Sequence, residues 1–250
     1  MKVGSDVLAV IGAASVSGNS LTLVGQLDRN LYAKTNKVLE AAGGKWNRKS
    51  KSHIFDGDAG DRVDQILITG SVDIPKDEFE FFPTPVDVVE LMMGKANIMD
   101  GMMVLEPSAG QGDIAKAAHA AATNVVVDMY ELMPANNAAL HALNLRLSGI
   151  GEPCDFMTVE PKPVYDRVVM NPPFSKQADI KHVLHALRFL KPGGLLVSVM
   201  SAGVTFRQNK LTNDFRSLVE QRGGFIEELP DGSFKTSGTM VNTVVVVIPA

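Results

Sequence analysis

The sequence is poor in cysteine, in tryptophan and in long apolar runs. Its single cysteine, Cys154, excludes an internal disulfide framework and fits a reducing compartment. Without a cluster of Cys and His, the chain is not expected to bind a structural zinc ion. No segment approaches the roughly 20 apolar residues that a membrane-spanning helix needs. We therefore expect a cytoplasmic protein with no metal and no membrane partner.

The chain also lacks a strong charge of either sign, because 24 Lys and Arg oppose 28 Asp and Glu. A net charge of -4 does not attract the whole chain to nucleic acid, so any such binding needs a local basic patch. With 45% hydrophobic residues among 250, the chain is long enough to bury a sizeable core in one or two domains.

Residues 1–78 differ in pattern from the remainder, and we interpret them as a small α+β accessory domain. The apolar stretch 7–14 is predicted to enter a β-hairpin that turns at Ser17-Gly18-Asn19, rather than to be a secretion signal. Helices are expected over 28–42, with Asp28 as N-cap, and over 59–67. Residues 79–250 would form the second domain.

The only basic cluster of the chain and its only tryptophan fall within residues 45–55. Lysine and arginine contact phosphates, and an aromatic ring can stack on a base. The alternative is a solvated turn with Trp46 in a small core. The candidate nucleic-acid contacts are Lys45, Trp46, Arg48 and Lys49.

From residue 81 onward, apolar strands alternate with helical patterns, which predicts a mainly parallel sheet with helices on both faces. Strands are expected at 103–106, 125–130, 167–170, 194–200, 225–229 and 241–248, with a weaker one near 152–154. Helices are expected at 85–96, 113–122, 135–147, 179–190 and 211–222. The last two strands should form an antiparallel pair at the sheet edge.

A glycine-rich loop, Glu106-Pro107-Ser108-Ala109-Gly110-Gln111-Gly112, follows the first of these strands and opens a helix at Asp113. An open α/β sheet binds its ligand at such a loop, where glycines let the backbone approach closely. The third glycine of a dinucleotide fingerprint is absent, and the carboxylates of Glu106 and Asp113 lie beside the loop. Carboxylates suit a ligand with a sulfonium and an ammonium, which favours S-adenosylmethionine over a pyrophosphate.

Acidic residues also mark the ends of the next two strands. Glu131, at the end of the second strand, is placed to accept both ribose hydroxyls. Asp155 and Phe156 fall where the third strand should end, and they could accept an adenine amine and pack on the base. Cys154, beside them, is expected to be a small buried hydrophobe that lies away from the target site.

The segment Phe82-Pro83-Thr84-Pro85 precedes a helix. Thr84 is the expected N-cap of that helix, with Pro85 at its first position. Thr84 is also a candidate for a hydrogen bond to the cofactor carboxylate.

The tetrapeptide Asn171-Pro172-Pro173-Phe174 suggests a target amine. A planar NH2 group has a delocalised lone pair, so acceptors must hold and turn it before it can attack a methyl donor. Asn171 Oδ1 and the Pro172 carbonyl can accept its hydrogens, and Phe174 offers a face to a flat substrate. The expected mechanism is direct in-line transfer with no covalent enzyme intermediate.

The order of these motifs along the chain resembles that of class I S-adenosylmethionine-dependent methyltransferases. The motifs are residues 82–85, 106–112, Glu131, 155–156 and 171–174. The closest resemblance is to the N6-adenine DNA methyltransferase group, over residues 81–250. It implies a Rossmann-like fold with a seven-stranded, mostly parallel sheet whose last strand is antiparallel. It also implies DNA as the partner, a target amine held by Asn171 and Pro172, and Phe174 stacked on the base. Phe234 resembles a second stacking aromatic of that group, with a buried loop phenylalanine as the alternative.

Two departures from that group leave the target open. A separate target-recognition domain is usual there and is not apparent here, so we expect low or partner-supplied sequence specificity. The fourth motif residue is Phe where Tyr or Trp is common, and Phe recurs among RNA guanine-N2 methyltransferases. Adenine-N6 methylation of DNA is the main prediction. The alternatives are methylation of guanine N2 or adenine in RNA, of a protein glutamine amide, or binding without turnover, which the intact Asn-Pro acceptor pair disfavours.

Overall fold

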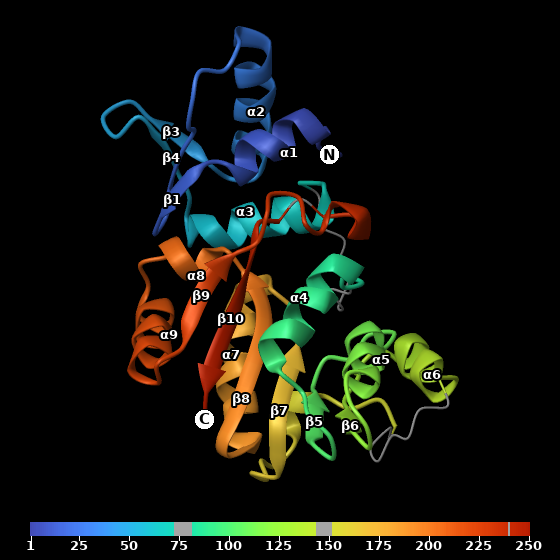
Figure 1. Ribbon diagram of the computed structural model, residues 1–250. Helices are drawn as coiled ribbons and strands as arrows, with labels where there is room; N and C mark the ends of the chain where they lie inside the picture. The colour runs from blue at the N-terminus through green and yellow to red at the C-terminus, as the bar shows by residue number, and fades with distance from the viewer. Residues whose placement is uncertain (73–81, 144–151, 240) are drawn as a thin grey trace.

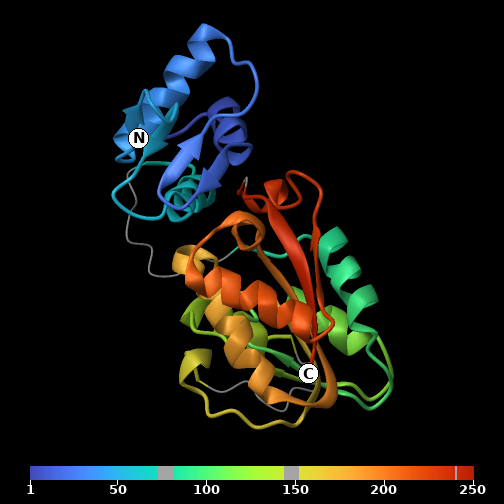
Figure 2. The same cartoon turned by 90° about the vertical axis from the view of Figure 1, so that its left-hand side faces the viewer.

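The computed structural model describes residues 1–72, 82–143, 152–239 and 241–250. A small N-terminal unit sits at one end of a larger α/β unit (Figures 1 and 2). The domain boundary expected between residues 78 and 79 lies outside the described residues. None of the described helices is long and apolar enough to cross a membrane.

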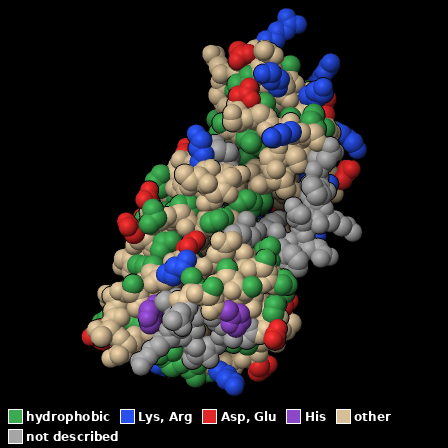
Figure 3. Space-filling model, turned by 90° about the vertical axis from the view of Figure 1, so that its right-hand side faces the viewer, with side chains coloured by type: hydrophobic (Ala, Val, Ile, Leu, Met, Phe, Trp, Pro, Cys, Tyr) green, Lys and Arg blue, Asp and Glu red, His purple; other side chains and the backbone are tan. Residues whose placement is uncertain are grey.

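The N-terminal unit is a small antiparallel sheet packed with helices. Its strands β1 (Ser15–Ser17), β2 (Ser20–Thr22), β3 (Lys45–Asn47) and β4 (Ser52–Ile54) lie in the order β1-β2-β4-β3, and its helices are α1 (Ser5–Gly12), α2 (Arg29–Ala41) and α3 (Ala59–Thr69). Asp28 caps α2 as expected, because its carboxylate accepts from the backbone N–H groups of Asn30 and Leu31. Several Lys and Arg side chains lie on the face of this unit that Figure 3 shows.

The expectation of a strand at 7–14 is wrong, because Ser5–Gly12 form helix α1. Val7, Leu8 and Ile11 are buried, and their spacing matches one helix face rather than the alternation of a strand. The turn of the predicted hairpin is confirmed, since β1 and β2 pair in antiparallel fashion on either side of Gly18.

The larger unit contains a six-stranded sheet of order β6-β5-β7-β8-β10-β9 among the described residues. Its strands are β5 (Met103–Glu106), β6 (Val126–Met129), β7 (Tyr165–Met170), β8 (Leu190–Ser201), β9 (Phe225–Glu228) and β10 (Thr243–Pro249). All neighbours pair in parallel except β10, which runs antiparallel to both β8 and β9. The mostly parallel sheet and its antiparallel final pair are therefore confirmed.

The expected seventh strand is wrong, because residues 152–154 form a bend and coil. The Cys154 N–H donates to the Glu131 carbonyl at 2.8 Å, and Pro153 has no N–H to offer. This segment therefore attaches to the end of the sheet without forming a ladder of hydrogen bonds.

Helices cover both faces of the sheet. Helices α4 (Val86–Ala96) and α5 (Asp113–Ala120) pack on one face, and α7 (Ala178–Ala186) and α9 (Lys210–Gln221) pack on the other (Figure 2). Strand β10 is buried on both faces, so Val245 and Val247 join the first core while Val244 and Val246 join the second. The first core also continues into the N-terminal unit.

Two expected helix boundaries change. Helix α6 (Pro134–His141) ends before the predicted residue 147, and positions 144–151 lie outside the described residues. Thr84 does not cap α4, because Pro85 occupies the N-cap position and no side chain bonds the first turn. The Thr84 hydroxyl instead contacts Asn171.

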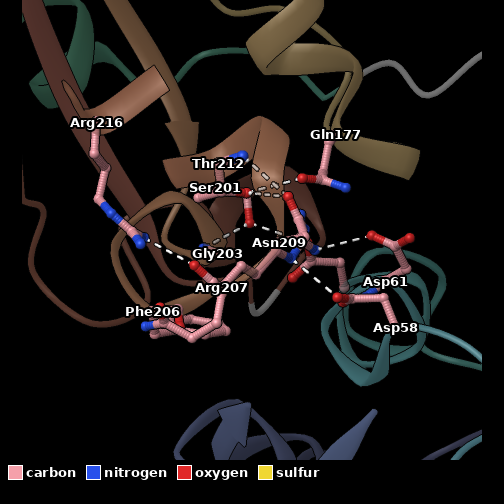
Figure 4. A network of polar contacts seen from close by, with 12 residues as sticks. Asp58, Asp61, Gln177, Ser201, Gly203, Phe206, Arg207, Asn209, Thr212 and Arg216 are labelled. Carbon is pink, nitrogen blue, oxygen red and sulfur yellow. Dashed lines mark hydrogen bonds and ion pairs between the residues drawn. The ribbon is translucent and has the colours of Figure 1, made fainter. Parts of the chain in front are cut away.

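A buried arginine joins the two units. Arg207 follows the short helix α8 (Gly203–Phe206) and is 1% exposed. It forms ion pairs with three aspartates of the N-terminal unit, one at the N-cap of α3 and two within this helix (Figure 4). These partners are Asp58 at 3.7 Å, Asp61 at 3.3 Å, and Asp64, which Arg207 contacts most closely. Asp64 also accepts from Ser201 Oγ at 3.1 Å. We call these four charged residues the Arg207 cluster.

Replacing Arg207 should destabilise the protein strongly. Arg207→Met leaves the aspartates without their buried cation, and breaking a buried ion pair costs roughly 3–5 kcal/mol. Urea unfolding should show a loss of that order. Lys210→Met is the matched control, because Lys210 pairs with Asp214 on the exposed surface of α9 and its loss should change stability little. Equal losses in both variants would contradict a stabilising role for the cluster.

Candidate active site

A cavity of about 300 Å³ lies at the carboxyl ends of β5, β6 and β7. Its volume is in the range of small-molecule sites, roughly 300–1,000 Å³. Most of the predicted cofactor and target residues meet there: Phe82, Pro83, Thr84, Glu106, Pro107, Ser108, Ala109, Gly110, Asp113, Glu131, Asp155, Phe156, Asn171, Pro172, Pro173 and Phe174.

Glu131 ties the glycine-rich loop to the end of β6. Its Oε2 accepts from the Gly110 N–H at 2.7 Å, and its Oε1 accepts from the Met133 N–H at 2.6 Å. The sequence predicted that Glu131 accepts the ribose hydroxyls of the cofactor. In the structure its carboxylate also stabilises the conformation of the glycine-rich loop.

Gly112 does not line the cavity, although we expected it to contact the cofactor. It begins α5 with a φ of +84°, and a Cβ there would approach Leu140 and Leu143 side-chain atoms at 2.9 and 2.6 Å. Its glycine is therefore required by backbone conformation and by close packing.

Glu106 is a buried carboxyl group with an unused acceptor. It is 1% exposed, and its Oε2 has no hydrogen-bond partner among the described residues. Burial, with the nearby charges of Asp113 and Glu131, raises the pKa of Glu106 well above the usual carboxyl range. Four of the described lining residues are acidic and none is Lys or Arg. This cavity therefore favours a cationic ligand and disfavours phosphate groups.

Asn171 directly follows β7, and its amide oxygen has no hydrogen-bond partner within the part of the chain that the structure describes. Its Nδ2 donates to Thr84 Oγ1 at 3.1 Å, while its buried Oδ1 has no partner among the described residues. Leaving such an acceptor unsatisfied costs about 1–3 kcal/mol, which a ligand N–H would offset. Pro172 and Phe174 line the same cavity, and Phe174 is 4% exposed. The predicted acceptors and aromatic ring thus lie together.

Asp155 and Phe156 form another wall of the cavity. Asp155 Oδ1 accepts from the Met157 N–H at 2.9 Å and starts a single 3₁₀ turn. The Phe156 ring packs against His185 and Phe189, with ring centroids 4.9 and 5.0 Å away. This packing fixes the wall before any ligand binds.

Eight further lining residues were missed from the sequence: Gln111, Ile114, Leu132, Met133, Asn136, Cys154, Met157 and His182. Leu132 and Met157 directly follow the predicted site residues Glu131 and Phe156, and Met133 follows Leu132, so proximity in sequence is a signal that could have found them. His182 comes from α7 and carries no such local signal; burial lowers its pKa, which favours a neutral imidazole. The expectation that Cys154 is a buried small hydrophobe is wrong, because its side chain is only partly buried and it lines the same cavity as the target loop.

The structure does not bring the other predicted substrate contacts to this cavity. Phe234 is 0% exposed and packs in the interior, in agreement with the alternative of a buried loop phenylalanine. Lys45 and Trp46 lie on β3, and Arg48 and Lys49 lie in the turn that follows it. Trp46 is 44% exposed with its ring 5.1 Å from that of His53, so it is outside the small core.

Comparisons with known proteins identify the fold. No protein-family model and no curated protein matches the sequence. A modification subunit of a putative type I restriction enzyme from Vibrio vulnificus YJ016 aligns with a TM-score of 0.54 and 16% identity, over 91% of this chain and 54% of that chain. TrmN from Thermus thermophilus aligns at 0.47 and 19%, over 65% and 48%. TYW2 from M. jannaschii, solved with AdoMet, aligns at 0.49 and 17%, over 69% and 78%.

The fold is that of class I S-adenosylmethionine-dependent methyltransferases, as the sequence resemblance indicated. The chain spans about half the length of the Vibrio subunit, 54%. Apart from the absent strand at 152–154, the predicted fold class is confirmed, including the small α+β unit that precedes the sheet.

Proposed function

We propose that this chain is an S-adenosylmethionine-dependent methyltransferase that methylates the N6 amine of adenine in DNA. The observation that carries the proposal is a pair of buried acceptors, Asn171 Oδ1 and Glu106 Oε2, which have no partner among the described residues and belong to residues that line one cavity. The first suits the N–H of a planar amine, and the second suits a cationic cofactor.

The acidic residues of the cavity would hold the cofactor. S-adenosylmethionine supplies an activated methyl group on a sulfonium and also carries an ammonium, and both cations suit a cavity that contains Glu106 and Asp113. Glu131 keeps free lone pairs after its two backbone hydrogen bonds, and these would accept the ribose hydroxyls. Asp155 and Phe156 would contact the adenine.

The target loop would orient the amine. Asn171 Oδ1 and the Pro172 carbonyl would accept its two hydrogens and turn the nitrogen lone pair out of conjugation, while Phe174 packs on the base. Orientation of this kind supplies much of the acceleration in a direct transfer. A base in duplex DNA would first have to leave the stack, at a cost of a few kcal/mol.

The N-terminal unit supports a nucleic-acid substrate. Residues 1–72 contain nine Lys and Arg against seven Asp and Glu, although the whole chain is acidic. Three of those aspartates pair with Arg207 of the larger unit, and several Lys and Arg side chains are visible on one face of the N-terminal unit (Figure 3). A groove of about 450 Å³ between the units includes Ser175 and Lys176, which directly follow the target loop. The N-terminal unit therefore adjoins the segment that follows the target loop.

Two observations bear on the choice of nucleic acid. The similarity to the Vibrio subunit extends over 91% of this chain and so into the N-terminal unit, and a restriction-enzyme modification subunit favours DNA. Phe174 at the fourth motif position keeps guanine-N2 methylation of RNA as the second candidate.

Methyl transfer should depend on Asn171. Labelled S-adenosylmethionine, offered with DNA, RNA and protein separately, should label DNA and yield N6-methyladenine. Asn171→Ala should lower kcat about 100-fold or more, because it removes an acceptor aimed at the reacting amine. Asn213→Ala, at an exposed position of α9, is the control and should behave as wild type. N2-methylguanine in RNA, or unchanged turnover by Asn171→Ala, would contradict the proposal.

Cofactor binding should weaken as the pH is lowered. A bound cation stabilises ionised Glu106, so binding lowers its raised pKa and releases a proton wherever the free carboxyl was protonated. Calorimetric titration with S-adenosylmethionine in two buffers of different ionisation enthalpy should detect that proton. Glu106→Gln should lower the affinity roughly tenfold and abolish the release, since about 1.4 kcal/mol is one decade. Glu90→Gln, exposed on α4, should change neither, and proton release by Glu106→Gln would refute this assignment.

The β3–β4 turn should contribute electrostatically to DNA binding. Reversing two phosphate-contacting charges in Arg48→Glu/Lys49→Glu should weaken binding and make the plot of log affinity against log salt shallower by about two. Lys162→Glu/Arg188→Glu changes the net charge equally at exposed positions of the larger unit and should have a much smaller effect. Equal slopes for the two double variants would argue against contact by the turn.

A further inference from the structure

The hydroxyl of Thr84 has a partner that the sequence did not suggest. It sits directly before α4 without capping that helix, and its Oγ1 accepts from Asn171 Nδ2 at 3.1 Å. Asn171 is 87 positions further along the chain, at the end of the central strand β7. The contact therefore links the segment before α4 with the loop to which we assign the target amine.

This contact bears on which end of the Asn171 amide faces the target. A carboxamide has a donor end and an acceptor end of nearly equal shape, and only the oxygen can accept from an amine. In the structure Nδ2 is engaged by Thr84, and the buried Oδ1 is left without a partner among the described residues. Without the hydroxyl, Nδ2 would also lack a partner among the described residues, and the amide could turn its donor end toward the amine.

The segment that carries Thr84 is contacted by the loop that precedes β10. Ser237 Oγ donates to the carbonyl of Pro83 at 2.6 Å, and the Ser237 N–H donates to the carbonyl of Phe234 at 3.0 Å. Phe234 anchors this loop with a fully buried ring, in the same core against which Phe82 packs. The loop that contains this buried phenylalanine thus contacts the Thr84 segment through Ser237.

We propose that Thr84 is a positioning residue for methyl transfer, which holds the Asn171 carboxamide with its oxygen toward the target amine. The inference rests on the proposed function and assigns it one further residue. It differs from a role in holding the cofactor carboxylate, because the partner is Asn171 and the affected step is the transfer itself.

The test compares Thr84→Val, which keeps the shape and removes the hydroxyl, with Thr84→Ser, which keeps the hydroxyl. Thr84→Val should lower kcat about tenfold to a hundredfold, because a small misplacement of a reacting group has effects of that size. Its KM for S-adenosylmethionine should stay within about twofold of wild type, and Thr84→Ser should recover most of kcat. In an Asn171→Ala background, Thr84→Val should have no further effect.

Three kinetic results would overturn the proposal. They are an unchanged kcat in Thr84→Val, a rise confined to the KM for S-adenosylmethionine, or an equal loss of kcat with and without Asn171. The second result would assign Thr84 to the cofactor instead.

A measurement without turnover separates this proposal from the proposed function. In protein labelled with ¹⁵N-asparagine, the Asn171 side-chain signals are those that Asn171→Ala removes. Hydrogen exchange of these amide protons should be faster in Thr84→Val than in wild type, and Thr84→Ser should restore the slow rate. Equal rates in all three would overturn the positioning role, even if the wild type methylates DNA. Slow exchange in a wild type that methylates no amine would instead refute the proposed function alone.

Discussion

The parallel pairing of β5 with both of its neighbours is the constraint on which the site depends. Strands β6, β5 and β7 run in the same direction, so their carboxyl ends meet at one edge of the sheet. Glu106 is the last residue of β5, Glu131 and Asn171 come after the ends of β6 and β7, and the pairing gathers all three into one cavity. A slip of one residue in any strand would turn its side chains to the opposite face. Strands buried on both faces resist such a slip, because each slip would break a packed core.

The polar groups at this edge fall into two kinds. Glu131 has both oxygens bonded to backbone N–H groups, so it belongs to the architecture of the loop. Glu106 and Asn171 each keep one buried oxygen without a partner among the described residues. Burying these acceptors without hydrogen bonds costs free energy. A cationic ligand beside Glu106 and a planar amine beside Asn171 would offset this cost. The unsatisfied groups therefore define the chemistry more sharply than the cavity shape does.

Local patterns predicted most elements but failed where the pattern was short. The run of apolar residues in β10 and the cap at Asp28 are strong signals, and both elements form as expected. Residues 7–14 contain an apolar run that fits a helix and a strand equally well, and packing against α2 and α3 selects the helix. Residues 152–154 lie at the expected position of a strand, but they do not form one. Pro153 has no N–H to donate, and the backbone N–H of Cys154 donates to the carbonyl of Glu131, just after β6.

By itself, the sequence determined the order of the motifs, the alternation of strands and helices, and the side chains that stand at the strand ends. These properties follow from periodicity and turn residues, which act over a few positions. Only the tertiary structure decided that Thr84 contacts Asn171 instead of capping α4, that Phe234 is buried, and that Arg207 joins the two units. Each of these outcomes pairs groups from distant segments, and burial makes a missing partner costly. No local pattern encodes which distant partner a buried group will meet.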